Sequence, residues 1–168
     1  MELANRSNMR IIYRSCTDNH SRMTQIAGDN IESENLSRLI DWYLEPRLQL
    51  SKAPIIFAND NIDISIGKFD LLNKKKIMFA HGHSDNVNKC VDNFIAATHE
   101  YIDYVLLAHY HNAKEKSYGS SKVFVNGSIV GTEQYAFGKR LFGIAEQKLL
   151  IFDKDNVIDL SINVQNIK

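Results

Sequence analysis

The chain has 168 residues, 44% of them hydrophobic, which suits one globular domain spanning residues 1–168. Twenty basic and twenty acidic residues cancel, so no overall field is expected to recruit nucleic acid or a membrane, although a local basic strip would suffice for a nucleic-acid substrate. No apolar stretch reaches membrane-spanning length, and the two cysteines, Cys16 and Cys90, fit a reduced, cytoplasmic protein.

The predicted elements alternate between strands and helices along the chain. Turn residues, apolar spacing and the position of Pro46 predict them in this order: a strand at 9–17, a helix at 33–45 that Pro46 should end, strands at 53–58, 63–69 and 75–81, a helix at 86–100, strands at 104–109 and 122–127, and a C-terminal hairpin turning at 155–156. This alternation predicts an α/β architecture, and the late strands add antiparallel pairs to make the sheet mixed.

Five of the six histidines follow predicted strands. His20 comes after the first strand, His81 and His83 after the strand at 75–81, and His109 and His111 at the end of the strand at 104–109. The carboxyl ends of strands in an open α/β sheet form the edge where ligands bind, so we expect a convergent polar site. Along an extended backbone, His109 and His111 would also point to the same side.

The other two histidines fit supporting roles. His83 could stand behind the ligands rather than among them. His99 lies late in the predicted helix at 86–100, where an imidazole can simply cap the last carbonyls.

The residue types at this edge favour a metal site over other chemistries. A nucleophilic triad would need a G-x-S-x-G turn, and a phosphate cradle would need clustered glycines; the sequence contains neither. What remains is a set of imidazoles together with Asn19 and nearby aspartates. Such mixed ligands suit manganese, iron or zinc, and two such ions about 3.5–4 Å apart would clamp a phosphoryl group and activate water.

Four stretches together resemble a known family. "TDNHSR", "FAHGHSDN", "LLAHYH" and "FVNGSIVGTEQYA" occur in the order seen in calcineurin-like metallophosphoesterases, and the match looks closer to the phage-encoded, DNA-exonuclease-like branch. The resemblance covers about residues 9 to 152. It implies that the chain contributes to a four-layer αββα sandwich with a mixed sheet, and that the activity is a metal-dependent phosphodiesterase of exonuclease type.

The resemblance also implies roles for individual residues. Asn19, His81 and His109 would bind one metal ion and His111 the other, with Mn²⁺ expected first and Fe²⁺ or Zn²⁺ as alternatives. His20 would be the catalytic acid that protonates the leaving oxygen, a task that suits imidazole near neutral pH.

The chain also departs from the family pattern. The family's first two motifs, whose aspartates bind and bridge the metals, should precede the asparagine–histidine motif, which here starts at residue 18. The chain therefore looks like a C-terminal half with an incomplete dinuclear site. A split gene whose partner supplies the first half, a shortened product and a decayed domain all remain open. A missing half would leave a sheet edge and an apolar face, so we expect a homo-oligomer or a complementary N-terminal chain.

Two functions follow from this. The first is a phosphodiesterase, which we expect to be inactive as this chain alone. If the gene is viral, we expect this enzyme in the host cytoplasm. Its rival is a non-catalytic remnant that binds a partner or nucleic acid. Lys74, Lys75 and Lys76 precede the histidine strand and could contact a phosphate backbone, although lysines in a turn are more commonly just solvated.

Overall fold

The computed structural model describes residues 9–24, 26, 29, 31–51, 54–58, 60–72, 74–132, 134–140 and 142–165. The chain forms two compact units, Met1–Phe69 and Asp70–Lys168, and each is described here by itself. The prediction of one domain over 1–168 stays a prediction.

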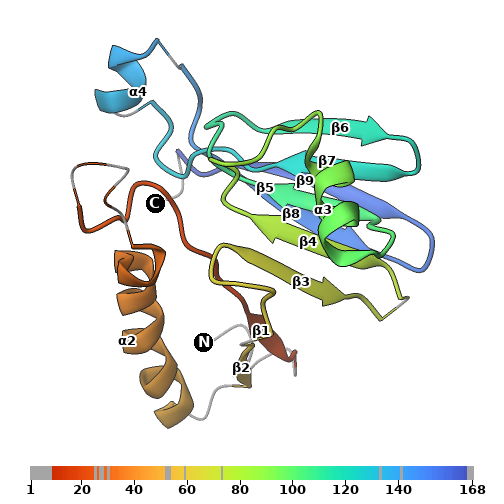
Figure 1. Cartoon of the computed structure of the whole chain (residues 1–168), viewed down its shortest axis with the longest axis horizontal. Helices are drawn as coiled ribbons and strands as arrows, with labels where there is room; N and C mark the ends of the chain where they lie inside the picture. The colour runs from red at the N-terminus through yellow and green to blue at the C-terminus, as the bar shows by residue number, and fades with distance from the viewer. Residues whose placement is uncertain are drawn as a thin grey trace. The chain divides into compact units, whose positions relative to one another are not determined.

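The first unit contains a two-stranded parallel sheet and one long helix (Figure 1). Strand β1 (Ile11–Tyr13) pairs with β2 (Ile55–Phe57), and the rings of Tyr13 and Phe57 lie 4.8 Å apart on one face of the pair. A short 3-10 helix, η2 (Glu32–Glu34), precedes helix α2 (Leu36–Leu50). The predicted first strand, 9–17, is reduced to three residues, because its pairing with the equally short β2 ends at Tyr13 and Phe57.

Helix α2 corrects the expectation that Pro46 ends the helix. The helix begins one turn later than predicted and continues through Pro46 to Leu50. Proline lacks the N–H that would bond the carbonyl four residues earlier, at a cost of about 3 kcal/mol. No residue of α2 that the structure describes is buried, so water can satisfy that carbonyl. Asn35 fixes the start of the helix, because its Oδ1 accepts hydrogen bonds from the backbone N–H and the hydroxyl of Ser37.

A mixed sheet has strand order β3-β4-β5-β7-β6, and the second unit contains all of its strands except most of β3. Its members are β3 (Ile66–Asp70), where the two units divide, β4 (Lys76–Ala80), β5 (Tyr104–Leu107), β6 (Lys114–Tyr118) and β7 (Ser121–Val125). Strands β4, β5 and β7 are parallel, and β6 runs antiparallel to β7. The predicted α/β architecture with a mixed sheet is confirmed.

The core of this unit is the central sheet and the helix that covers it. Helix α3 (Cys90–Thr98) buries Cys90, Val91 and Phe94 and is shorter than the predicted 86–100. His99 ends it in the left-handed conformation, with its backbone N–H bonded to the carbonyl of Ile95, and capping by the His99 imidazole stays a prediction. The sheet contributes these fully buried side chains: Ile77, Met78, Val105, Val123, Phe124 and Val125.

The C-terminal hairpin was predicted correctly and lies over the other face of the sheet from α3 (Figure 1). It consists of β8 (Glu146–Phe152) and β9 (Val157–Asn163) and packs the ring of Phe152 4.9 Å from that of Tyr104. Strand β6 and helix α4 (Gln134–Gly138) were not predicted. β6 begins with three consecutive charged residues and has no apolar run, because as an edge strand it buries little.

Within the part of the chain that the structure describes, no helix combines the length and the apolar character that a membrane crossing needs.

Candidate metal centre

Three histidines of the second unit lie together at the carboxyl edge of the sheet. Ala80 and Leu107 are register partners in the parallel strands β4 and β5, and the N–H of Ala108 bonds to the carbonyl of His81 at 3.0 Å. The ring centroids of His81 and His109 are 5.3 Å apart, those of His81 and His83 are 5.7 Å apart, and those of His83 and His109 are 6.3 Å apart. Parallel pairing therefore joins two motifs that are 28 residues apart in sequence.

The backbone at this edge is strained. His109 and His111 have φ values of 60° and 61°, in the left-handed region that residues with a Cβ rarely adopt. The N–H of Tyr110 bonds to the carbonyl of Ala108 at 2.6 Å, so His109 sits at the centre of a three-residue turn. Strain of this kind gathers at functional sites, where the surrounding structure must hold it in place.

These turns correct the expectation about His109 and His111. Strand β5 ends at Leu107, before both residues, so they do not alternate along an extended strand. Their directions are set instead by their own positive φ angles, one on either side of Tyr110. Gly82, between His81 and His83, also has a positive φ of 100°, which allows the backbone to turn sharply between the two rings.

The donor atoms of the cluster are largely withdrawn from solvent. Nε2 of His81, Nδ1 of His109 and Nδ1 of His111 are buried, while the side chain of His83 is exposed. The ring of Tyr110 stands edge-on to that of His109, 5.7 Å away, and its hydroxyl donates a hydrogen bond to the carbonyl of Asp85. The histidines thus line a half-buried polar edge with one ring facing water.

Asp85 is a member of this edge that the sequence analysis did not single out. Burial raises the pKa of the Asp85 carboxyl, and the charge that His83 can carry works in the opposite direction. The motif "HGHSD" signalled it only as one aspartate among many.

The fit of this cluster to a metal ion is partial. Two imidazoles bound to one tetrahedral ion hold their ring centroids about 5 Å apart, given metal–nitrogen distances near 2 Å. The three observed separations are equal to this or slightly wider. However, among the described residues no three His, Cys, Asp or Glu side chains stand in position to hold an ion. Binding would require small rotations of the rings, and we derive no reaction step through a metal.

Asn19 and His20, which belong to the first unit, lie in a tight polar turn. The carboxylate of Asp18 accepts hydrogen bonds from the backbone N–H groups of His20 at 2.6 Å and Ser21 at 2.8 Å. The Asn35 amide that caps α2 also donates to the Asp18 carbonyl at 2.7 Å, so the turn is tied to the start of the helix. The Oδ1 of Asn19 is buried without a hydrogen bond, a state that costs free energy and suits a ligand atom. His20 is exposed. A site that joins these two residues to the histidines of the second unit stays a prediction.

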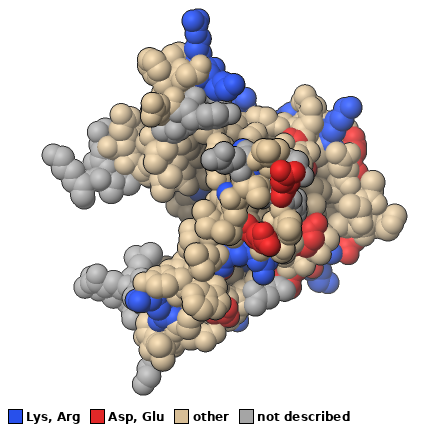
Figure 2. All heavy atoms as spheres, turned by 60° about the vertical axis from the view of Figure 1, so that its left-hand side comes forward, with Lys and Arg blue, Asp and Glu red and all other residues tan. Residues whose placement is uncertain are grey.

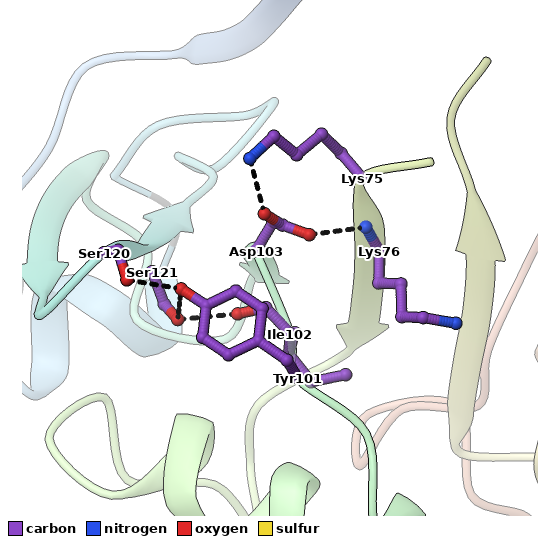
Figure 3. A network of polar contacts seen from close by, with 7 residues as sticks. All are labelled: Lys75, Lys76, Tyr101, Ile102, Asp103, Ser120 and Ser121. Atoms are coloured by element: carbon purple, nitrogen blue, oxygen red, sulfur yellow. Dashed lines mark hydrogen bonds and ion pairs between the residues drawn. The ribbon is translucent and has the colours of Figure 1, made fainter. Parts of the chain in front are cut away.

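Lys75 and Lys76 lie away from the histidine edge. They are at the start of strand β4, whereas His81 follows its end. Figure 3 shows the two residues converging on Asp103: its carboxylate accepts from the Lys75 ammonium at 2.8 Å and from the Lys76 backbone N–H at 2.9 Å. The Lys76 ammonium pairs with Glu100 at 2.7 Å. Hydrogen bonds with these acids raise the pKa of both lysines. This arrangement favours a structural role over contact with a phosphate backbone.

No family model matches the chain, and no curated protein matches it. Among solved structures, a predicted phosphoesterase from Streptococcus pneumoniae aligns with a TM-score of 0.47 and 15% identity, over 66% of this chain and 62% of that one. Vps29 from Entamoeba histolytica, complexed with Zn²⁺, aligns with a TM-score of 0.46 and 14% identity, over 72% and 75% of the two chains. Because identities and TM-scores are this low, we base no functional assignment on these alignments.

Proposed function

We propose that this chain carries the histidine half of a metallophosphoesterase-like site and does not hydrolyse phosphodiesters by itself. The observation that supports this is the gathering of His81, His83 and His109 just past the ends of two neighbouring parallel strands, with His109 and the nearby His111 in the left-handed conformation. A structural role alone would not require imidazoles at left-handed positions, where glycine or asparagine would be less strained.

His81 and His109 are the proposed ligands of one divalent cation, with Asn19 as a third ligand and His111 on the side of a second ion. Mn²⁺ is the first candidate, because amide oxygen and imidazole both suit it, and Fe²⁺ and Zn²⁺ are the alternatives. When bound, such an ion would act as a Lewis acid toward a phosphoryl oxygen. His20 is the proposed proton donor to the leaving oxygen, and its exposure is compatible with access to a substrate.

Charge is the reason to expect inactivity in isolation. All the proposed ligands are neutral, and the resemblance implies that the bridging aspartate lies outside this chain. Two dications 4 Å apart repel by about 4 kcal/mol even in bulk water, and by more in a partly buried site. Without carboxylates to offset this repulsion, the second ion should be nearly absent.

A non-catalytic role as a partner-binding module is the second candidate. Its support is the amount of exposed apolar side chain in both units, including Ile12, Ile56, Leu149 and Leu160. On the face drawn in Figure 2, basic and acidic side chains are interspersed over a mostly uncharged surface, which favours a protein partner over nucleic acid. The partner would be a second copy or a complementary N-terminal chain. A preference for DNA, a viral origin and a place in host cytoplasm rest on the resemblance and on the reduced cysteines alone.

Complementation tests the proposal most directly. The purified chain is assayed with Mn²⁺ on single- and double-stranded DNA and on a small phosphodiester, alone and with a separately expressed N-terminal half of a related metallophosphoesterase. We expect no hydrolysis alone, and hydrolysis with two ions bound when the halves combine. Robust hydrolysis by the chain alone would overturn the proposed inactivity. A combined pair in which His81→Ala and His109→Ala change neither metal content nor rate would overturn the proposed site.

A further inference from the structure

The hairpin β8–β9 exposes an apolar face in the second unit. Antiparallel register pairs Leu149 with Leu160, Ile151 with Ile158 and Gln147 with Ile162, so these six side chains share one face. The five aliphatic members are between 40% and 53% exposed. We call this set the outer hairpin face. The side chain of Gln147 bonds to Asn126 and to the Gly127 carbonyl, which leaves the aliphatic residues as the exposed part.

The opposite face of the hairpin is fixed against the unit. Phe152 packs on Tyr104, and the backbone N–H of Lys148 donates to Asn126 Oδ1 at 2.8 Å. Lys148 and Asp159 form an ion pair whose side chains are only 9% and 17% exposed. Gly127 allows this close packing, because a Cβ there would lie 2.4 Å from the Glu146 side chain. The hairpin therefore cannot turn over to hide its aliphatic residues without breaking these contacts.

We propose that the outer hairpin face packs against the same face of a second copy of this chain. The face contains no charged residue, so two copies bring no like charges together at its centre. The five side chains expose roughly 400 Å² per copy, which is in the range of the largest apolar patch on a typical monomer, and such patches are often functional. A face-to-face contact would bury roughly 800 Å² from these side chains, and with its polar rim would reach the lower range of specific interfaces.

The charges at the hairpin tip select an orientation. The tip carries Asp153, Lys154 and Asp155, a net negative group, while the other end carries Glu146 beside the polar residues Asn163 and Gln165. A two-fold arrangement with antiparallel hairpins keeps the two acidic tips apart. Leu149 and Leu160 form the central register pair of the outer hairpin face, so the two-fold axis passes near Leu160. Two sheets that pack face to face in this way lie about 10 Å apart. This contact uses none of the residues proposed to bind metal; it rests on the partner-binding role proposed above and is independent of the metal site.

Sedimentation equilibrium of the purified full chain tests the proposal. We expect a dimer at micromolar concentrations, weakened at least about 30-fold by Leu160→Lys, as for a central interface residue. Leu72→Lys is the matched control, because Leu72 is fully exposed and lies outside the hairpin, and it should leave the dimer intact. His81→Ala with His109→Ala should also leave it intact. Mixing Leu160→Lys with Leu160→Glu should restore association, since opposite charges then meet near the axis.

If Leu160→Lys fails to fold, Ile158→Thr with Leu160→Thr keeps the strand preference and replaces it in the test. A chain that stays monomeric at about 100 µM would overturn the proposal. So would a dimer that neither Leu160→Lys nor the threonine pair weakens, or a monomer whose hairpin face is covered only by a different polypeptide.

Discussion

The rings of His81 and His109 lie 5.3 Å apart because the residues before them, Ala80 and Leu107, are register partners in adjacent parallel strands. The Ala108 N–H that bonds to the His81 carbonyl continues this pairing one step past the strand ends. The hydrogen-bond ladder of the sheet therefore fixes the backbone spacing beneath the two imidazoles, and this spacing should change little when the rings rotate to bind an ion.

Metal affinity should depend on this pair. We expect His81→Ala and His109→Ala each to lower the affinity for Mn²⁺ or Zn²⁺ at least about tenfold, because each removes one of few neutral ligands. Titration calorimetry measures this. His99→Asn is the control: it removes an imidazole outside the cluster, and asparagine tolerates the left-handed position that His99 occupies at the end of α3. Equal affinity in the wild type and the double mutant would mean that these histidines only mark a lost site.

The same binding should weaken as the pH is lowered, because protons compete with the metal for the imidazole nitrogens. Calorimetry at several pH values, in buffers of different ionisation enthalpy, would show protons released on binding. Binding that is independent of pH would point to oxygen ligands instead.

The Tyr13 hydroxyl should lose its proton at a higher pH than an ordinary tyrosine. Burial first, and then its 2.8 Å hydrogen bond to Asp41, raise the pKa of Tyr13 from 10.0 to about 12. The folded state thus holds the phenolic proton more tightly than the unfolded state. The stabilisation from this group is complete below pH 10 and is lost as the pH rises toward 12. Absorbance at 295 nm, compared with Tyr13→Phe, isolates this group among the seven tyrosines, and Asp41→Asn should move its pKa back toward 10.

The two cysteines should differ in reactivity. Cys90 is fully buried, and burial followed by the nearby Asp85 charge raises the pKa of its thiol to about 11. Cys16 is only half-buried. The native chain should therefore react with about one equivalent of a disulfide reagent at pH 8, and with two after denaturation. In Cys16→Ser the native reaction should nearly vanish; rapid labelling of that variant would contradict the burial of Cys90.

Two ion pairs should contribute unequally to stability. Lys148 and Asp159 are nearly enclosed beneath the hairpin, so Asp159→Asn leaves a buried ammonium and should lower the free energy of unfolding by about 2–4 kcal/mol. Lys122 and Glu115 are both 40% exposed, and Glu115→Gln should cost less than about 1 kcal/mol. Urea denaturation of both variants measures the difference. Similar losses in the two would mean that the hairpin is more hydrated than its packing indicates.

Much of this protein is encoded locally and is visible in its sequence. The apolar run before His109 predicts a strand, the "DN" turn predicts the final hairpin, and the spacing of Cys90 and Phe94 predicts one buried helix face, because each depends on neighbours within a few residues. The same locality explains why His81 and His109 could be placed at strand ends.

Other features depend on contacts between distant residues, and only the tertiary structure decided them. The register of β4 with β5 brought the ring of His83 beside His81 and His109, although the sequence analysis had assigned His83 a supporting role. Positive φ angles, rather than strand alternation, direct His109 and His111. Helix α2 passes through Pro46 although the local rule predicts a stop, and the edge strand β6 forms without an apolar pattern. In each case long-range pairing or solvent exposure outweighs a local preference of a few kcal/mol, and a local pattern contains no record of that competition.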